Sequence, residues 1–412
     1  MEKLTNVQSE FLKILESFMH DKEYLLPDDF AHLPELFEMS KQHHMVAAVF
    51  EQIRQSPICY SQAYAGLTMA WKRFSIRDVM IQMQKTEGFL NVYEKLVQAG
   101  VTPLVMKGAI CRNLYSKPDH RISGDEDMLL AKEQFEQCDR ILMQEGYVRE
   151  ELDMEHLSYE IPYLNRQNGV YIELHLSQFP EESGAYGHLN DEFGEVFAHK
   201  VCEQVQGRQV WTLCPTEHLF YLICHSFKHF LHSGFGMRQV CDMILMAEMY
   251  GAQIDWADIE ERLYRLNMKT YWDALVKIGE EYLGFSLEKA KYPEQMYNPE
   301  VDIEPLLKDL LDSGIYGAST MERKHSSNMT LAAVESGKAN TTASLTASLF
   351  PSRKYMKTQF EWLKKYPWLL PAAYVIRVFR YLKSSAAEKQ EKNSVAIGMG
   401  RVELLREYRI IK

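Results

Sequence analysis

The sequence has few cysteines, and they are not clustered. Seven are spread through 412 residues, and no two form a Cys-x-x-Cys pair. Zinc sites and disulfide frameworks need closely placed cysteines, so the spacing indicates neither. We therefore predict reduced thiols in a cytoplasmic protein.

Long apolar runs are also missing. No stretch approaches the roughly 20 apolar residues that a helix needs to span a bilayer. The first residues carry Glu10 and Glu16 and do not resemble a secretory signal. We therefore predict a cytoplasmic chain without a transmembrane segment.

Excess positive charge is the third absence. The chain has 46 Lys and Arg against 57 Asp and Glu, a formal net charge of -11. General binding to a phosphate backbone needs a broad positive field, so nucleic acid is a less favoured partner. The hydrophobic content of 46% is ample for a globular core in two or three domain-sized units.

Apolar residues recur at helical spacing through the first quarter of the chain. Leu4, Val7, Phe11, Leu15 and Phe18 are one such series, and a later helix ends before Gly100. The pattern predicts an N-terminal helical region over residues 1–95.

Short predicted strands and helices alternate over residues 96–210, which indicates an α+β core. Short strands are predicted at 103–106 and 125–130, and helices at 109–115 and 132–145, the second ending at a left-handed Gly146. Residues 169–177 alternate most clearly, with an apolar face and a polar face. The apolar face comprises Val170, Ile172, Leu174 and Leu176, and the polar face comprises Tyr171, Glu173 and His175.

Two carboxylates lie side by side in this pattern. On a strand, Asp125 and Asp127 would project to one side while Glu126 points away. Two close anions repel unless a cation lies between them, and oxygen ligands favour Mg²⁺ or Mn²⁺. Glu173, from a neighbouring strand, is the candidate third ligand, and a solvated acidic turn is the alternative. Because of the repulsion, replacing Asp127 with asparagine is expected to raise the melting temperature of the metal-free protein.

A Lys107-Gly108 turn precedes the acidic pair. It lies where a strand passes into a helix, and a glycine there lets backbone amides approach a phosphate at the helix N-terminus. The predicted order along the chain is a strand, this turn, a helix, the strand with Asp125 and Asp127, and the strand with Glu173. This order favours a functional site over a solvated acidic turn.

The segments LVMKGAICRNLY, HRISGDEDMLLA and VYIELHL resemble the uncharacterised bacterial nucleotidyltransferases of the DNA polymerase β superfamily. The resemblance covers roughly residues 85–250. It implies a polymerase β-type core with a mixed sheet, phosphate contacts from Gly108 and Ala109, and metal ligation and catalysis by Asp125, Asp127 and Glu173. Two positions depart from the family pattern: Ala109 replaces the usual Ser or Gly, and Glu173 replaces the usual Asp.

A polar stripe marks the helix expected at 215–232. An ordinary solvated face mixes Glu and Lys, so a stripe of His and Lys suggests contact with phosphate or substrate, chiefly by His225, Lys228 and His229. Zinc held by His225 and His229, or hydrogen-bonded histidines at an interface, are the alternatives. The stripe comprises His218, Tyr221, His225, Lys228, His229 and His232.

Nearby arginines admit two interpretations each. Arg238 and Asp242 have the spacing of an intrahelical ion pair, with a pocket wall as the alternative. Arg121 either steadies a triphosphate or is an ordinary surface arginine.

The last third of the chain is predicted to be mainly helical. A helical domain lining the cleft is expected over 211–322, a Ser/Thr-rich loop or linker over 323–350, and a helical segment over 351–412. Residues 355–382 mix aromatic and basic side chains, which fits packing onto the catalytic core or contact with a membrane surface or an anionic partner.

The expected reaction is transfer of a nucleoside monophosphate from an NTP such as ATP to an acceptor, with release of pyrophosphate. The acceptor is a small molecule, a peptide or a protein, with RNA less favoured by the acidic balance. A kinase on the same fold and an inactive nucleotide-binding scaffold are the rival functions.

Overall fold

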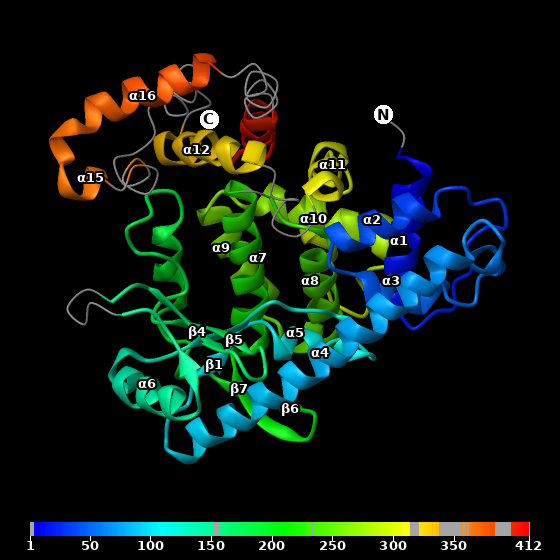
Figure 1. Ribbon diagram of the computed structural model, residues 1–412, viewed down its shortest axis with the longest axis horizontal. Coiled ribbons are helices and arrows are strands. Elements are labelled where there is room, and N and C mark those ends of the chain that lie inside the picture. Colours follow the sequence, from blue (N-terminus) through cyan, green and yellow to red (C-terminus); the bar gives the residue numbers. More distant parts are fainter. Residues whose placement is uncertain are drawn as a thin grey trace.

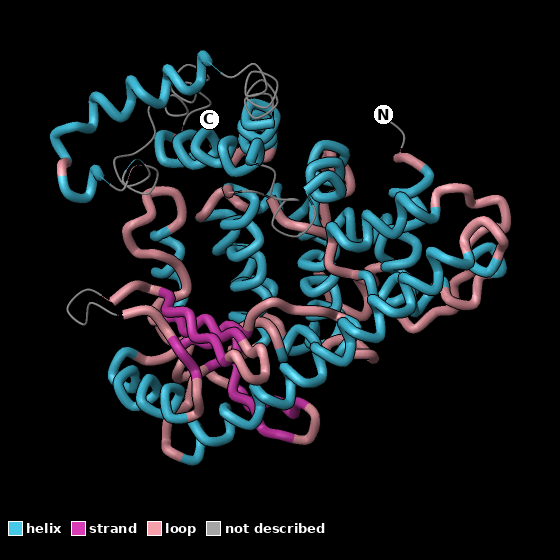
Figure 2. The backbone as a smooth tube through the Cα atoms, in the orientation of Figure 1, coloured by secondary structure: helices cyan, strands magenta, loops and turns pink. Residues whose placement is uncertain are grey.

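The structure is a computed structural model, and it describes residues 4–151, 157–232, 234–313, 321–337, 356, 360, 362–383 and 397–411. Figure 1 shows an N-terminal helical region, a small sheet beneath the central helices, and further helices above them. Figure 2 shows the strands gathered at one side of a mainly helical molecule. The architecture is α+β, as the sequence predicted.

The N-terminal helices follow the predicted periodicity. Thr5 and Gln8 form a capping box that starts the first helix, and Phe11, Leu15 and Phe18 on its inner face are buried. The longest helix ends at Gln98, just before Gly100 with its φ of 83°. The elements are α1 (Asn6–Met19), α2 (Leu33–Gln42), α3 (Val46–Ile53), η1 (Pro57–Tyr60) and α4 (Ala65–Gln98).

A five-stranded mixed sheet follows, in the order β1-β2-β5-β4-β3. Only the β2–β5 pair is parallel, and the other three pairs are antiparallel. A separate hairpin turns at Gln206 and Gly207, which both have positive φ, as a tight two-residue turn requires. The strands are β1 (Leu104–Val105), β2 (Glu126–Leu129), β3 (Tyr147–Val148), β4 (Glu160–Asn165), β5 (Tyr171–His175), β6 (Val201–Val205) and β7 (Arg208–Thr212).

Helices and 3₁₀ turns connect these strands close to the predicted positions. Gly146, with φ of 81°, ends the helix after β2 in the left-handed conformation that was predicted. The connecting elements are α5 (Ala109–Asn113), η2 (Pro118–His120), η3 (Lys132–Gln134), α6 (Phe135–Gln144) and η4 (Gly187–Phe193).

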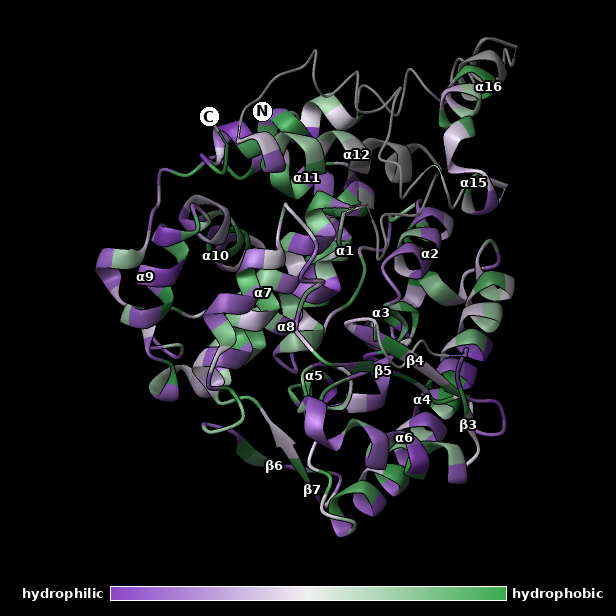
Figure 3. Cartoon of the chain, turned by 90° about the vertical axis from the view of Figure 1, so that its left-hand side faces the viewer, coloured by the Kyte–Doolittle hydropathy of each residue, from purple (hydrophilic) through white to green (hydrophobic). Residues whose placement is uncertain are grey.

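Helices from the second half of the chain cover the sheet edge that carries the polar residues. In Figure 1 the helices α7 and α8 rise above β4 and β5. Figure 3 shows α9 at the edge of the molecule with hydrophilic residues on it, while its Trp256, Ile259 and Leu263 are buried. The elements are α7 (Pro215–Leu231), α8 (Met237–Tyr250), η5 (Gly251–Gln253), α9 (Trp256–Arg265), α10 (Lys269–Leu283), η6 (Glu294–Met296) and α11 (Glu304–Ser313).

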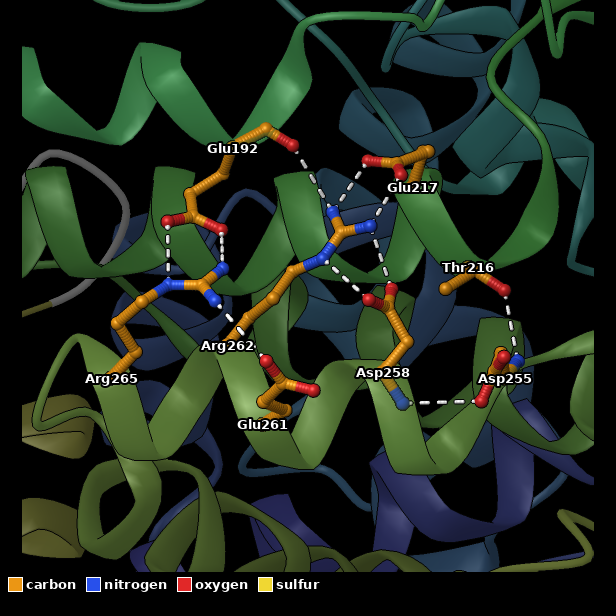
Figure 4. Close-up of polar contacts among 8 residues, drawn as sticks. All are labelled: Glu192, Thr216, Glu217, Asp255, Asp258, Glu261, Arg262 and Arg265. Carbon is orange, nitrogen blue, oxygen red and sulfur yellow. Dashed lines mark hydrogen bonds and ion pairs between the residues drawn. The ribbon is translucent and has the colours of Figure 1, made fainter.

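Arginine pairs join α9 to α7 and η4. Arg262 donates to both carboxylate oxygens of Glu217 on α7, at 2.9 and 2.7 Å, and also pairs with Asp258. Arg265 reaches Glu192 of η4 at 2.6 Å (Figure 4). Two-point contacts of this kind fix orientation, so they hold the first turn of α7 in place.

The segment predicted as a loop over residues 323–350 is helical in its first part, which corrects that prediction. Residues 323–336 belong to α12 (Met321–Ser336), whose Met329 and Ala333 are buried. Ser and Thr are weak helix formers, but burial of one face outweighs that preference. Residues 338–350 lie outside the described part of the chain.

The described C-terminal residues form two separate contacts. Met356, Phe360, Leu363 and Ala373 pack into a small cluster of their own, which differs from the expected packing on the catalytic core. Residues of the last helical turns, such as Leu405 and Tyr408, join the main core instead. The elements are α15 (Trp362–Lys365), η7 (Pro367–Leu369) and α16 (Leu370–Lys383). Within the described ranges, none of the helices has both the length and the apolar character that crossing a bilayer requires.

Candidate metal and nucleotide site

Asp127 and Glu173 meet through the register of the sheet. The parallel pairing of β2 with β5 places them directly opposite each other, and His175 projects from the same face of β5 two residues later. One ligand atom from each of these three side chains lies within 4.8 Å of the others. The sequence placed His175 on the polar face of the strand but gave it no role.

Asp127 is the most enclosed member of this group, with an exposed fraction of 1%. Its Oδ1 accepts a hydrogen bond from Nζ of Lys107 at 3.0 Å and faces Nε2 of His175 at 3.2 Å. Burial alone raises the pKa of a carboxyl group, but Lys107 and His175 outweigh it and hold the pKa of Asp127 below its usual value. The Oδ2 atom of Asp127 is buried and has no hydrogen-bond partner among the described residues.

Glu173 has the opposite electrostatic character. Burial, with the charges of Asp127 and Asp125 as further causes, raises the pKa of Glu173 to about 8. Several carboxyl groups therefore act on one another in a partly buried site. Clustered carboxylates and a buried carboxylate oxygen without a partner in the described part of the chain fit a divalent cation, since oxygen-rich sites select such ions. The residues present thus suit the metal that the sequence predicted.

Asp125 lies outside the close group of three. Strand β2 begins at Glu126, so the alternation that would place Asp125 beside Asp127 does not extend to it. Asp125 is partly buried and lines the same cavity as Glu173. The close group thus comprises two of the predicted carboxylates and an imidazole, and the metal-binding role of Asp125 stays a prediction.

Glu126 is buried beneath the turn that precedes α5. Its carboxylate accepts a hydrogen bond from the amide of Ala109 at 2.7 Å and pairs with Arg112 at 2.6 Å. The N-terminus of α5 is therefore capped by a side chain of the protein. The amide of Ala109, which the sequence assigned to a phosphate, is already satisfied, and Ala109 itself is buried.

Replacing Gly108 with alanine is expected to destabilise the protein by about 2–3 kcal/mol. Gly108 has φ of 51°, and a Cβ there would lie 2.0 Å from Oε2 of Glu126. Gly66→Ala is the matched control, because Gly66 lies in the first turn of α4 with nothing within 4 Å, and it should be neutral or slightly stabilising. Urea unfolding of both variants measures the effect; equal midpoints would contradict this packing at Gly108.

A cavity of about 260 Å³ adjoins the carboxylates and is closed on its other side by α7 and α8. Most of the residues predicted from the sequence to contact ligand line this cavity. They are Lys107, Gly108, Arg121, Asp125, Glu173, His225, Lys228 and His229. Tyr159, Glu160 and His175 line it as well and were not predicted as site residues, and Arg238 and Asp242 line it in keeping with the pocket wall that was their alternative interpretation.

A family model described as uncharacterised nucleotidyltransferase matches residues 31–284, which include every residue of this site. The chain belongs to this nucleotidyltransferase family. No curated protein and no solved structure matches the chain. Membership of the nucleotidyltransferase family implies an NTP substrate and leaves the acceptor open. Placement in the DNA polymerase β superfamily stays a prediction.

The stripe on α7 divides into two parts. Nε2 of His225 accepts from Nζ of Lys107 at 3.0 Å and lies 3.3 Å from Nε2 of His229. Burial and the charge of Lys107 hold the pKa of both histidines well below the usual value, which keeps them neutral. Lys228 donates to the hydroxyl of Tyr159 at 3.2 Å and lies over its ring.

Two other histidines of the stripe, His218 and His232, have structural contacts. Nε2 of His218 lies 2.5 Å from the carbonyl of Met106, and Nε2 of His232 lies 2.7 Å from the hydroxyl of Tyr186. These match the alternative of hydrogen-bonded interface histidines. His218 thereby steadies the backbone directly before Lys107.

Arg121 and Asp242 form a buried ion pair. Their exposed fractions are 3% and 2%, and Tyr115 donates to the same carboxylate at 2.9 Å. Arg121 is therefore not a surface residue, and its charge is already balanced. Arg238 donates to the carbonyl of Ile122 and faces the cavity. Nothing local in the sequence signals a pair between residues 121 positions apart.

Proposed function

We propose that the protein transfers a nucleoside monophosphate from an NTP to an oxygen of an acceptor and releases pyrophosphate. The reaction depends on Mg²⁺ or Mn²⁺ held by Asp127 and Glu173, with Asp125 at the edge of the site. The observation that carries the proposal is the placement of Asp127 opposite Glu173, with Oδ2 of Asp127 buried and without a hydrogen-bond partner among the residues that the structure describes.

The divalent metal, when bound, neutralises charge on the triphosphate and on the departing pyrophosphate. The acceptor oxygen forms a bond to the α-phosphorus as the bond from that phosphorus to the pyrophosphate oxygen breaks. Glu173, partly exposed to the cavity, takes the proton that the acceptor oxygen loses. Asp127 is held in place for this reaction by Lys107.

Cationic and polar side chains lie across the cavity from the carboxylates. Lys228 and Arg238 supply positive charge, and the neutral His225 and His229 supply hydrogen bonds. The triphosphate would lie between this wall and the metal, because each of its negative charges then faces a cation. Lys107, kept charged by Asp127 against the effect of burial, completes the positive side.

The acceptor is a small molecule, a peptide or a protein. The net charge of -11 makes nucleic acid the less favoured acceptor. We place the reaction in the cytoplasm, in keeping with the unclustered cysteines.

Incubation of the full chain with metal, candidate acceptors and NTP labelled at either the α- or the γ-phosphate tests the proposal. Transfer of the α-label with release of pyrophosphate is the expected result. Transfer of the γ-label would instead identify a kinase. Binding of Mg²⁺-NTP with no transfer to any acceptor pool would support a nucleotide-binding scaffold, and both outcomes overturn the proposed reaction.

Replacing Lys228 with alanine should weaken Mg²⁺-NTP binding by about 1–3 kcal/mol, the scale of a lost charged hydrogen bond. Lys228 carries one of the cations that face the carboxylates across the cavity. Lys132→Ala is the control, since Lys132 is exposed and paired only weakly with Glu181. Isothermal titration calorimetry compares the three proteins. Unchanged affinity in Lys228→Ala would remove this residue from the binding site.

A further inference from the structure

The third member of the close ligand group is an imidazole. Nε2 of His175 lies 3.2 Å from Oδ1 of Asp127 and 4.0 Å from Oε2 of Glu173. His175 has an exposed fraction of 2%, so bulk water does not mediate these approaches. Its position follows from the strand, because Glu173 and His175 share one face of β5.

The spacing of the three groups matches that of ligands around one cation. With metal–ligand bonds of about 2.1 Å, adjacent ligands of an octahedral ion are about 3.0 Å apart and opposite ligands about 4.2 Å apart. The separation between Asp127 and His175 is close to the first value, and that between Glu173 and His175 is close to the second. One ligand atom from each of the three side chains lies within 4.8 Å of the other two, which places all three within reach of one ion.

A purely structural role for His175 would leave the local charge unresolved. If Nε2 donates a hydrogen bond to Oδ1 of Asp127, the Oδ2 atom of Asp127 still has no partner among the described residues. The charges of Asp127 and Asp125 also act on Glu173, and Lys107 is the basic side chain paired with Asp127. A divalent cation shared by Asp127, Glu173 and His175 supplies the missing positive charge.

We infer that His175 is a direct ligand of the catalytic metal and that the site therefore favours Mn²⁺ over Mg²⁺. This inference rests on the proposed function, since it concerns the metal of the same site. Mg²⁺ is a hard ion that prefers oxygen ligands, whereas imidazole suits the transition-metal ions better. An all-carboxylate site would lack this preference.

Pulsed electron paramagnetic resonance of Mn²⁺ bound to the full chain, without nucleotide, tests the inference directly. The wild type should show coupling between Mn²⁺ and an imidazole nitrogen, and His175→Asn should lose it. The matched control is His225→Asn, which changes another cavity histidine whose ring contacts Lys107, and it should keep the coupling. Loss of coupling in His225→Asn with retention in His175→Asn would place the metal on α7 and overturn the inference.

Affinity ratios provide a second measurement that does not depend on activity. His175→Asn should lower the ratio of the Mg²⁺ to the Mn²⁺ dissociation constant about tenfold, because only the transition metal gains from the nitrogen. A residue that merely orients Asp127 would weaken both metals equally and leave the ratio unchanged. Circular dichroism of the variant checks its fold, and His175→Gln provides a second variant if asparagine unfolds the protein.

The outcomes distinguish this inference from the proposed function. Mn²⁺ that binds through Asp127 without nitrogen coupling would overturn the role of His175 and leave nucleotidyl transfer intact. Failure of Asp127→Asn to change Mn²⁺ binding would overturn both.

Discussion

Replacing Asp127 with asparagine should lower turnover by about 10³-fold, equivalent to about 4 kcal/mol of transition-state stabilisation. Asparagine keeps the shape of the side chain but removes the charge that the proposed metal requires. Nucleotidyl transfer from α-labelled NTP measures the loss. Glu133→Gln removes one charge from an exposed position in η3 and should retain wild-type turnover.

The same variant has a second expected effect, on stability. The sequence alone suggested that Asp127→Asn would stabilise the metal-free protein by relieving repulsion between carboxylates. The structure reverses the sign, because Nζ of Lys107 lies 3.0 Å from Oδ1 of Asp127 and would lose its buried partner. The melting temperature of the metal-free variant should therefore fall. A rise would mean that repulsion with Asp125 and Glu173 outweighs the ion pair.

Asp242→Asn is expected to destabilise the protein by about 3–5 kcal/mol, the usual cost of leaving one buried charge without its partner. Asp242 balances Arg121 and accepts from Tyr115, and the pair is almost wholly excluded from water. Urea unfolding followed by circular dichroism gives the free energy of unfolding. Because Arg121 borders the cavity, NTP affinity should also fall in this variant.

Two controls make this prediction specific. The double variant Arg121→Met with Asp242→Leu removes both charges together and should lose less stability than Asp242→Asn alone. Glu181→Gln breaks the exposed pair with Lys132 and should cost at most about 1 kcal/mol. A double variant less stable than the single one would show that the pair itself, rather than an unbalanced charge, stabilises the fold.

Local patterns allowed much of the fold to be predicted. The alternation through Ile172, Glu173 and Leu174 gave β5, and helical spacing gave α1, α6 and α7, because burial of one face repeats with a fixed period. The Ser/Thr-rich stretch was misread because α12 is fixed by its contact with α7, through Thr330 and the carbonyl of Leu231. Such a contact leaves no periodic signal.

The sequence identified several residues of the candidate site but not how they are arranged. Lys107, Asp127 and Glu173 were singled out by residue type and by their place in strands and turns. The sequence did not predict that Glu126 caps α5, because this contact depends on how close the buried Glu126 side chain lies to Gly108 in the folded chain. Because of that contact, the amide of Ala109 is already hydrogen-bonded to Glu126 instead of facing a phosphate.

The sequence by itself determined the helices α1, α5, α6 and α7, the strands β1, β2 and β5, the α+β class and the carboxylates available for metal binding, since each depends on residues that are near neighbours in the chain. Tertiary structure alone decided which side chains meet. The parallel register of β2 and β5 brings His175, 48 residues away, to Asp127, and the packing of α8 gives Arg121 its partner Asp242, 121 residues away. Strand register and helix packing arise from burial summed over the whole core, and a local stretch of sequence does not contain that sum.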